Sequence, residues 1–280
     1  MKINIIPEKG VLDIFFQMVK GNIGLVLDES KLYLLEARLN PLAKKNGFNG
    51  YAELISNLII RPLGELHWDA FEALLTNETM FFRDEYFFKG LTHFLLPELI
   101  KKNRLSKELN IWCTSVSTGQ EVYSLAMILQ DHFPELSNWN LQLKATDVCK
   151  TVLKKAEEGI FSESEIKRGL TPLQIHKHFT MVDGKAVEYK INDNLKQLIQ
   201  FDQVNLIKDL PISMKYDLIL MRNVLIYFSA ETKIQVLSKI SSNLKDSDSC
   251  LSLGASESLL YETCFDRFSV DRLTFYKKKQ

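Results

Sequence analysis

The turn Ser117-Thr118-Gly119 is the first place in this chain where residue types and spacing could do chemistry. Residues 110–116 before it predict a buried strand, and the apolar period over residues 122–129 predicts a helix after it. In an open α/β sheet such a turn lies at the carboxyl edge of the strands, where backbone N–H groups can face a polar or nucleotide-like ligand. A single glycine is a weak signal, because strand-turn-helix units without a ligand are common. The turn is therefore a candidate ligand site, with a plain connection as the alternative.

Two further polar positions stand at the ends of predicted strands. Residues 141–146 predict a second strand ending in Asp147, whose carboxylate can accept both hydrogens of a ribose diol. The alternative role for Asp147 is to cap the helix that follows. Residues 216–221 are almost wholly apolar and predict a central strand covered on both faces. This strand ends in Arg222 and Asn223, and an arginine at the tip of a buried strand requires an acceptor or water.

Two aromatic segments flank these positions. Residues 76–83, Thr-Asn-Glu-Thr-Met-Phe-Phe-Arg, combine polar side chains with two adjacent phenylalanines. Phe81 and Phe82 need burial, so the segment is predicted to pack into a cleft and not to serve as a surface linker. Tyr227 follows the tip of the apolar strand, and it is either a site residue or a core aromatic with a satisfied hydroxyl.

The elements that would hold these positions alternate between strand and helix from residue 110 onwards, which predicts an α/β fold. Further strands are predicted at residues 198–204 and 250–253, helices at 84–101, 151–159 and 232–244, and two antiparallel edge strands within 265–277. An antiparallel insert at about residues 179–192 interrupts the alternation, because Asp183-Gly184 between alternating apolar and polar residues is a strong hairpin signal.

The first 75 residues differ from the rest, because leucines at helical spacing and glycines between the segments predict short helices without strands. A small all-α N-terminal domain over residues 1–75 is expected. Pro41 opposes a single long helix near residues 32–45, since a proline inside a helix costs about 3 kcal/mol. Asn40 and Pro41 can instead cap a second helix.

Basic residues in this region recur at a regular interval. Lys31, Arg38 and Lys45 stand seven residues apart, so on an unbroken helix they would form one stripe opposite the leucines. With Lys44 added and Glu36 subtracted, residues 31–45 carry four positive charges minus one negative charge, a net +3. The alternative is an ordinary solvated face.

Composition limits the classes of function that remain. Lys plus Arg equals Asp plus Glu at 35 each, so no global charge favours nucleic acid or a membrane surface. The N-terminus lacks a signal-peptide pattern, and no apolar run approaches the roughly 20 residues that span a bilayer. The four cysteines show no CxxC spacing, and reduced, buried thiols are expected at Cys113 and Cys250. A soluble, cytoplasmic protein is expected.

Five separated motifs then match one pattern: Thr-Asn-Glu-Thr-Met-Phe-Phe-Arg (76–83), Ser-Thr-Gly-Gln-Glu-Val-Tyr-Ser (117–124), Ala-Thr-Asp (145–147), Val-Asn-Leu (204–206) and Arg-Asn-Val-Leu-Ile-Tyr-Phe (222–228). In this order they resemble the chemotaxis receptor methyltransferase family, CheR, over nearly the whole chain. The sequence departs from the family at Gln120, where a second glutamate is common, and at Ala255, where a histidine is common.

The resemblance implies a Rossmann-like S-adenosylmethionine-dependent methyltransferase domain over residues 106–280 with a small antiparallel β insert. A linker and cofactor-covering segment with a helix would occupy residues 76–105. The implied cofactor-binding residues are Asn77, Thr79, Arg83, Glu121, Asp147, Asn205, Leu206, Arg222 and Asn223. Arg83 and Tyr227 would lie nearest the reacting methyl group as catalytic residues. The resemblance also assigns receptor contact to the N-terminal helix, and so to Lys31, Arg38, Lys44 and Lys45.

The implied activity is that of a protein-glutamate O-methyltransferase acting on the cytoplasmic domain of chemotaxis receptors, with S-adenosyl-L-homocysteine as product. A glutamate with an ordinary pKa near 4.3 is ionised at neutral pH, so the reaction needs neither a general base nor a metal. No nucleic acid partner, no membrane insertion and a monomer are expected. Two alternatives stay open: a carboxyl methyltransferase acting on another protein, and a non-catalytic module that binds the cofactor or its product as a signal.

Overall fold

The computed structural model describes residues 7–182, 184, 187–208, 210, 214–259, 264–270 and 273–279. The chain divides into two compact units. Unit 1 is Met1–Thr76 with Tyr227–Lys233, and unit 2 is Asn77–Ile226 with Ile234–Gln280. Within the described residues, no helix combines the length and the apolar character that a membrane span needs.

Unit 1 is helical in its described part, as the sequence predicted. Its elements are α1 (Lys9–Ile23), η1 (Glu29–Lys31), α2 (Leu32–Lys45), α3 (Tyr51–Leu58) and α4 (Glu65–Leu74). The leucines of α2 that were expected to face inwards divide in two, because Leu35 and Leu39 are fully buried while Leu32 and Leu42 are half-buried. Phe15 of α1 and Phe71 of α4 are also fully buried. The core of unit 1 is thus built from one apolar side of each helix.

Helix α2 runs through Pro41 without a break, so the suggestion that a second helix begins at Asn40 and Pro41 was wrong. Proline removes the hydrogen bond to the carbonyl of Ala37, and both residues lie on the exposed side of α2 where water can reach that carbonyl. The Asn40 side chain does act at a helix start, but at another helix. Its Oδ1 accepts the backbone N–H of Tyr51, the first residue of α3, at 2.9 Å.

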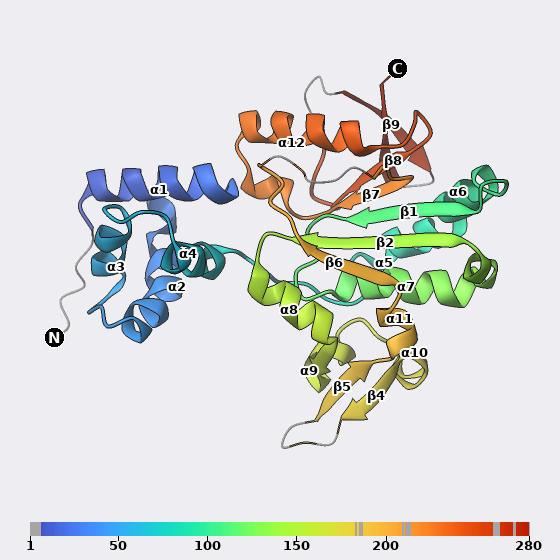
Figure 1. Ribbon diagram of the computed structural model, residues 1–280, viewed down its shortest axis with the longest axis horizontal. Helices are drawn as coiled ribbons and strands as arrows, with labels where there is room; N and C mark the ends of the chain where they lie inside the picture. The colour runs from blue at the N-terminus through green and yellow to red at the C-terminus, as the bar shows by residue number, and fades with distance from the viewer. Residues whose placement is uncertain are drawn as a thin grey trace. The chain divides into compact units, whose positions relative to one another are not determined.

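Unit 2 is built on one large sheet, which confirms the predicted α/β class. Its strands are β1 (Glu108–Cys113), β2 (Asn140–Asp147), β6 (Ile199–Gln203), β7 (Leu218–Met221), β8 (Cys250–Leu253), β9 (Phe265–Val270) and β10 (Leu273–Lys278). Among the described residues they form a seven-stranded sheet in the order β6-β2-β1-β7-β8-β10-β9. Pairing is parallel from β6 to β8, whereas β10 pairs antiparallel with β8 and with β9. The arrowheads of β1 and β2 lie at the same end of the sheet (Figure 1).

The sheet is buried on both faces at its centre. Leu109, Ile111 and Cys113 of β1 belong to the main hydrophobic cluster on one face. Trp112 points to the opposite face, where its indole N–H donates to Thr146 Oγ1 at 2.9 Å and its ring lies 5.3 Å from the ring of Tyr216. This alternation explains why the strand reads as a continuous apolar run.

The helices of unit 2 are α5 (Glu85–Gly90), α6 (Leu96–Lys102), α7 (Gln120–His132), α8 (Lys150–Glu158), α9 (Glu163–Lys167), α10 (Pro172–His178), α11 (Asp193–Lys196) and α12 (Ala230–Asn243), the last of which begins in unit 1. Short 3₁₀ turns are η3 (Pro134–Asn138) and η4 (Leu225–Tyr227). Between α5 and α6 lies a π-helical stretch, η2 (Leu91–Leu95), so the helix expected over residues 84–101 is present but contains a wider turn.

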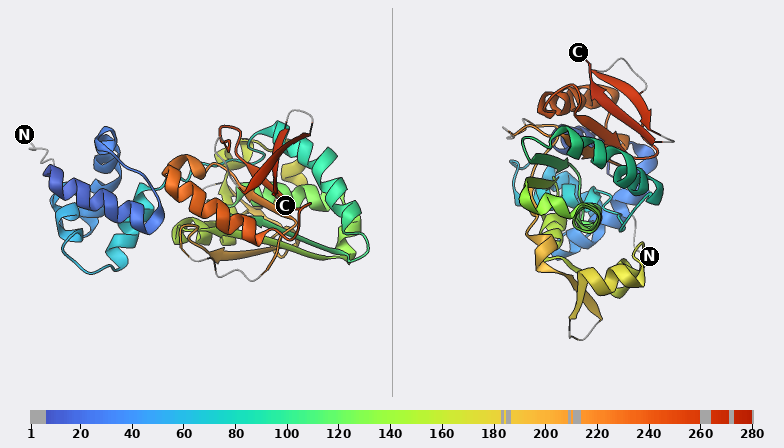
Figure 2. Two further views of the ribbon diagram at one scale, coloured as in Figure 1. Left: turned by 90° about the horizontal axis from the view of Figure 1, so that it is seen from above. Right: turned by 90° about the vertical axis from the view of Figure 1, so that its right-hand side faces the viewer.

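The insert is larger than the hairpin that the sequence predicted. A second sheet pairs β5 (Glu188–Ile191) antiparallel with both β4 (Phe179–Val182) and β3 (Ile160–Ser162). The predicted turn residue Asp183 lies outside the described residues. In two views the insert projects from the large sheet as a separate small body (Figure 2, right). Fully buried Phe161 and nearly buried Phe179 anchor it to unit 2.

Candidate cofactor site

Because β6, β2, β1 and β7 are parallel neighbours, their carboxyl ends bring together segments far apart in the sequence. The N–H of Val116 donates to the Thr146 carbonyl at 3.0 Å, and that of Thr114 donates to the Leu220 carbonyl at 2.9 Å. The β1–α7 turn is therefore attached to both neighbouring strands. The strand expected over residues 110–116 ends at Cys113, and Val116 belongs to this turn.

The turn has a strained backbone that its surroundings maintain. Ser117 has a φ of 51° and Gly119 a φ of 94°. A Cβ on Gly119 would lie 3.0 Å from the Cβ of Ala156 on α8, so only glycine fits there easily. The Ser117 N–H donates to Asp147 Oδ2 at 2.9 Å, and the Ser117 hydroxyl donates to the Asn77 carbonyl at 2.7 Å.

Asp147 serves the structure at both of its carboxylate oxygens. Oδ2 accepts the Ser117 N–H, and Oδ1 accepts the N–H of Cys149, the cap residue of α8, at 3.0 Å. The N-cap position of α8 is occupied by Cys149, so Asp147 is not the helix cap considered from the sequence; its bond to the Cys149 N–H shapes the turn that leads into the helix. Each carboxylate oxygen has two lone pairs, so these bonds leave room for further donors such as ribose hydroxyls. The residue is 7% exposed, at the rim of the turn.

Arg222 finds the acceptors that its position required. Its Nη1 donates to Glu121 Oε2 at 2.6 Å, and its Nη2 donates to Asp84 Oδ2 at 2.5 Å. The guanidinium also lies 4.1 Å from the centre of the Phe87 ring. Its side chain is 1% exposed. Arg222 thus ties the tip of β7 to the start of α7 and to the segment that precedes α5, and its Nε finds no partner among the described residues.

The segment 77–83 packs against the turn and α7, as its aromatic residues predicted. The rings of Phe81 and Phe161 are 5.0 Å apart, and Phe81 is fully buried. The Phe82 N–H donates to the Ser124 hydroxyl on α7 at 2.9 Å. Arg83 and Thr79 are half-buried, and Arg83 Nη1 donates to the Glu78 carbonyl at 3.2 Å.

The remaining candidates of unit 2 follow β6 and β7. The Val204 N–H donates to the Asp147 carbonyl at 3.0 Å, which places Asn205 and Leu206 directly after that contact. Leu206 is 6% exposed, and Asn205 Oδ1 accepts the Ile207 N–H at 3.3 Å. Asn223 has a φ of 60°.

The structure brings most of the expected residues of unit 2 to one sheet edge, and adds two that the sequence analysis missed. Asp84 pairs with Arg222, and Glu257 accepts the Asn223 N–H at 2.6 Å. Asp84 directly follows the 76–83 motif, and Glu257 belongs to the Gly-Ala-Ser-Glu-Ser segment noted for Ala255. Asp84 and Glu257 therefore stand in or next to segments that the sequence analysis singled out, but the residues that they contact are remote in the sequence.

Tyr227 and the basic residues belong to unit 1. The Tyr227 carbonyl accepts the Val26 N–H at 3.0 Å, and the residue is half-buried. Lys44 and Lys45 are exposed at the end of α2, and Lys31 is exposed in η1.

Arg38 does not extend freely into solvent. Its Nη1 donates to the carbonyls of Leu74 and Leu75 at 2.6 and 2.8 Å, and Nη2 donates to Thr76 Oγ1 at 3.1 Å. Arg38 therefore caps the carboxyl end of α4, where a cation is favoured by the helix dipole.

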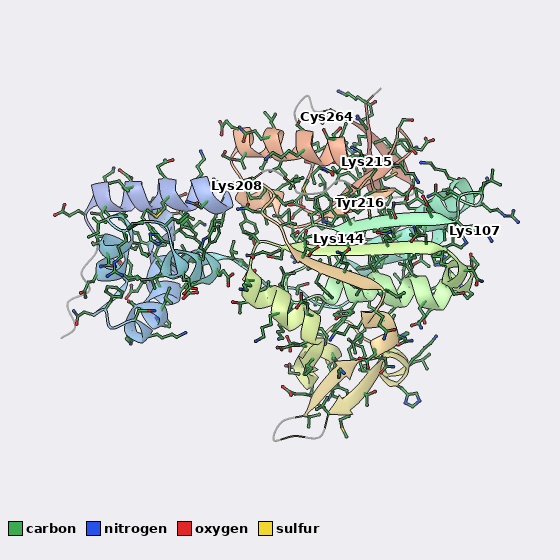
Figure 3. All side chains as sticks on the ribbon, viewed as in Figure 1. Lys107, Lys144, Lys208, Lys215, Tyr216 and Cys264 are labelled. Carbon is green, nitrogen blue, oxygen red and sulfur yellow. The ribbon has the colours of Figure 1, made fainter. Side chains whose placement is uncertain are left out.

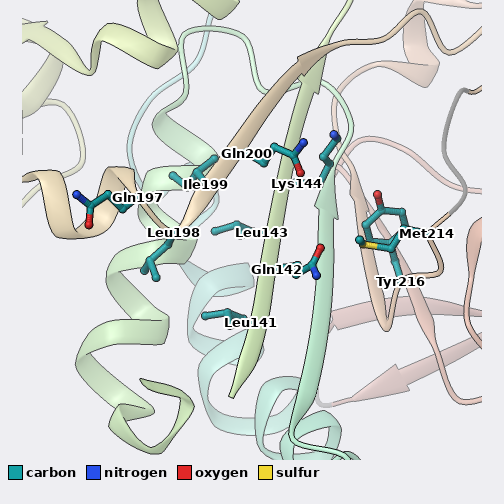
Figure 4. Close-up of a pocket in the computed structure, with 10 residues that line it drawn as sticks. All are labelled: Leu141, Gln142, Leu143, Lys144, Gln197, Leu198, Ile199, Gln200, Met214 and Tyr216. Atoms are coloured by element: carbon teal, nitrogen blue, oxygen red, sulfur yellow. The ribbon is translucent and has the colours of Figure 1, made fainter. Parts of the chain in front are cut away.

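Two cavities of unit 2 differ in their relation to this edge. One of about 400 Å³ is lined by Leu141, Lys144, Gln200 and Tyr216 among others (Figure 4). It lies on the amino half of β2, with Lys144 and Tyr216 also visible in Figure 3, and so does not adjoin the candidate site. A second cavity of about 370 Å³ is lined by Asp84, Arg222 and Glu257 and adjoins the site directly. Over the part of the chain that the structure describes, no group of three or more His, Cys, Asp or Glu side chains could hold a metal ion.

A parallel sheet with one antiparallel strand near its edge, a glycine-containing turn after β1 and a carboxylate at the tip of β2 defines a Rossmann-like nucleotide-cofactor domain. Glu121 and Asp147 supply acceptors suited to an ammonium group and to a ribose, and Leu206 supplies an apolar surface suited to a base. These residues fit S-adenosylmethionine.

Comparison with known proteins also indicates a domain that binds S-adenosylmethionine. The family model described as "CheR methyltransferase, SAM binding domain" matches residues 77–274. A chemotaxis protein methyltransferase of Vibrio parahaemolyticus is 36% identical over 261 residues, covering 92% of each chain. Chemotaxis protein methyltransferase 1 of Vibrio cholerae is 35% identical with the same coverage, and that of Pseudomonas aeruginosa is 35% identical over 252 residues, 88% of this chain and 89% of that one. This chain belongs to the CheR methyltransferase family.

Proposed function

We propose that this protein transfers the methyl group of S-adenosylmethionine to glutamate side chains of chemotaxis receptors, forming glutamate methyl esters. The observation that carries the proposal is the meeting of the 77–83 segment, the Ser117–Gly119 turn, Asp147 and the Arg222–Glu121 pair at one sheet edge. The proposed substrate is the cytoplasmic domain of such receptors, so the reaction is proposed to occur in the cytoplasm. The enzyme is proposed to act as a monomer.

The cofactor would be held by residues of this edge. Glu121 would accept from its amino-acid end, Asp147 from the two ribose hydroxyls, and Asn205 with Leu206 would line the base. Asn77, Thr79 and Asn223 complete the proposed binding set. Because the Arg222 guanidinium is enclosed and already paired with two carboxylates, its contribution is to orient Glu121 and to fix the β7 tip.

The bound cofactor supplies a methyl carbon on a positively charged sulfur, whose carbon–sulfur bond breaks as the acceptor oxygen attaches. A glutamate with a pKa near 4.3 is already an anion at neutral pH, so no base has to remove a proton. The protein's task is alignment, an effect that can contribute roughly 7 to 11 kcal/mol. Arg83 is proposed to orient the acceptor carboxylate, and Tyr227 to hydrogen-bond it. The contact must not be stronger in the ground state than in the transition state.

Transfer of labelled methyl to a receptor cytoplasmic domain tests this function. A glutamate ester releases the label as methanol in mild base. Label on another protein but not on the receptor would favour a different carboxyl acceptor. Tight binding of S-adenosylhomocysteine without any transfer would favour the non-catalytic signalling module.

A further inference from the structure

Glu257 lies in the loop that follows β8, and within the described residues its carboxylate accepts from three backbone N–H groups. Oε2 accepts the N–H of Asn223 at 2.6 Å and that of Gly254 at 2.8 Å. Oε1 accepts the N–H of Ile226 at 3.3 Å. A single side chain therefore joins the loop after β8 to the loop after β7, which carries Arg222 and Asn223.

The backbone on both sides is arranged for this contact. Asn223 has a φ of 60°, a left-handed conformation that is uncommon outside glycine, although asparagine tolerates it better than most L-residues, and that hydrogen bonds from its surroundings stabilise. A Cβ on Gly254 would lie 2.9 Å from the Asn223 nitrogen and 2.8 Å from Glu257 Oε2. Glycine at this position lets the two loops approach, while the turn from the Glu257 N–H to the Gly254 carbonyl, 2.9 Å, returns the carboxylate towards β7.

Glu257 is also beside the ion pairs that the buried Arg222 makes with Asp84 and Glu121. It lines the 370 Å³ cavity together with Asp84 and Arg222. Arg222 and Asn223 are consecutive, so the backbone that Glu257 fixes is the backbone from which the enclosed guanidinium extends. Hydrogen bonds from N–H groups to a carboxylate are roughly twice as strong as neutral ones.

We propose that Glu257 is a positioning residue for cofactor binding: its carboxylate holds the left-handed Asn223 and thereby fixes the β7 tip on which Arg222 and Asn223 stand. The inference rests on the proposed function, because those two residues belong to the proposed cofactor edge. Glu257 acts through the backbone of its neighbours and does not itself touch the cofactor.

The test measures S-adenosylhomocysteine binding by calorimetry in four proteins: wild type, Glu257→Ala, Glu257→Gln and the control Ser258→Ala. Ser258 lines the same cavity from the adjacent position, so its truncation controls for a change in the cavity wall that leaves the Glu257 carboxylate in place. Glu257→Ala should weaken binding roughly ten- to a hundred-fold, the range for losing hydrogen bonds to a charged group. Glu257→Gln keeps one acceptor oxygen for Asn223 and Gly254 and should recover much of that loss. Ser258→Ala should bind as wild type does.

A thermodynamic cycle with Asn223→Gly separates positioning from a general loss of structure. If Glu257 acts by holding the left-handed backbone of Asn223, its truncation should weaken binding much less in the Asn223→Gly background, because glycine adopts a positive φ without support. In turnover assays the Michaelis constant for S-adenosylmethionine should rise, and that for the receptor should stay constant.

Equal affinity of wild type and Glu257→Ala would overturn the inference, as would additive losses in the cycle or an equal rise in both Michaelis constants. Failure of the wild-type protein to bind S-adenosylhomocysteine would instead overturn the proposed function. The two failures are therefore distinguishable.

Discussion

The carboxylate of Asp147 accepts two buried backbone N–H groups, one from the ligand turn and one from the start of α8. Removing it affects both the fold and the proposed ribose contact. Because Ser117 and Cys149 would lose their acceptor, Asp147→Ala should lower the free energy of unfolding by about 2 to 4 kcal/mol. It should also weaken S-adenosylhomocysteine binding roughly ten- to a hundred-fold.

Urea unfolding measures the first effect and calorimetry well below the unfolding temperature measures the second. Asp147→Asn is the matched control, since it retains one acceptor oxygen without the charge. A destabilised variant that still binds with wild-type affinity would leave Asp147 with its structural role only, as the acceptor for the Ser117 and Cys149 N–H groups.

The half-buried Arg83 donates from its guanidinium to the Glu78 carbonyl, and its own carbonyl accepts from Arg222. Its proposed partner is the receptor carboxylate, so Arg83→Ala should reduce turnover by at least ten-fold while changing cofactor affinity less. Arg83→Lys keeps the charge but loses the two-pronged geometry, and an intermediate rate is expected. Steady-state methylation at saturating cofactor measures both variants. Full turnover of Arg83→Ala at saturating receptor would reject this role.

For single residues, the sequence predicted that a side chain requires a hydrogen-bond or ion-pair partner more readily than it predicted which residue that partner is. It indicated that Arg222 required an acceptor, because this follows from residue type and position, whereas its alternative of Asp147 as a helix cap was wrong by two residues. It could not identify Asp84, because that partner is 138 residues away along the chain. The same holds for Glu257, whose role depends on two loops that meet only in the folded sheet.

Three of the basic residues expected to meet the receptor, Arg38, Lys44 and Lys45, lie on helix α2, and Lys31 precedes them in η1. Among these four, Arg38 differs because its guanidinium bonds the end of α4. Arg38→Glu would place a carboxylate among the carbonyls at the end of α4, so it should lower the melting temperature of unit 1. Lys31→Glu with Lys45→Glu removes exposed charge only. That double variant should raise the Michaelis constant for receptor and flatten its salt dependence.

Methylation rates across a salt series measure this effect, and the exposed pair Lys101→Glu with Arg104→Glu, which changes the net charge by the same amount, is the control. Cofactor affinity should remain constant in each variant. If the Lys31 and Lys45 changes leave the rate at low salt unaltered, these lysines form an ordinary solvated face.

An ion-pair cluster connects α7 to α10, the helix that leads into β4 of the insert. Asp131 Oδ1 lies 2.7 Å from Lys177 Nζ, and Asp131 Oδ2 accepts from His178 Nε2 at 2.9 Å. Burial acts to raise the pKa of Asp131, but the hydrogen bonds and charges of these two partners outweigh it and hold the pKa below its ordinary 3.8. A lowered pKa in the folded state stabilises the protein above the unfolded-state value, and this contribution is lost as the pH falls through the folded-state value.

Wild type should therefore exceed Asp131→Asn in unfolding free energy at pH 6, and the difference should shrink below about pH 4. Urea unfolding of both proteins from pH 3 to 7 measures the difference. The exposed Asp193→Asn, whose partner Lys190 lies within the insert, is the control. A difference that is the same at every pH would show that the charge of Asp131 does not contribute.

Helices and strands with a clear hydrophobic periodicity were predicted well from the sequence, whereas very short elements were not. The strand at residues 250–253 and the two antiparallel edge strands lie where alternation and apolar runs placed them. Strand β3 was missed, because three residues cannot establish a period, and it exists only by pairing with β5. Pro41 argued for a helix boundary that is absent, because a proline on an exposed face costs less than one in a buried turn.

At the scale of the whole molecule, the sequence predicts that the helical N-terminal unit ends near residue 75. It does not predict that a later segment of the chain belongs to that unit as well. Residues 227–233 group with the helical unit, although they follow the most apolar strand of the sheet. Tyr227 and Arg222 are thus assigned to different units despite being five residues apart. Hydrophobic periodicity cannot predict this division into units, because it depends on contacts between segments that are remote in the sequence.

The two partners of Arg222 lie 138 and 101 residues before it in the chain, and this separation governs when the site can form during folding. Contacts so distant in sequence carry a large loop-closure cost and form late. The cofactor edge should be absent from the transition state for folding, so S-adenosylhomocysteine should slow unfolding and leave the refolding rate nearly unchanged. Stopped-flow fluorescence of a Trp68→Phe variant, whose remaining tryptophans Trp112 and Trp139 both belong to unit 2, measures the two rates separately. Faster refolding in the presence of ligand would place the cofactor edge in the folding nucleus. If the refolding rate is unchanged, the ligand slows unfolding of the enzyme but does not assist its folding.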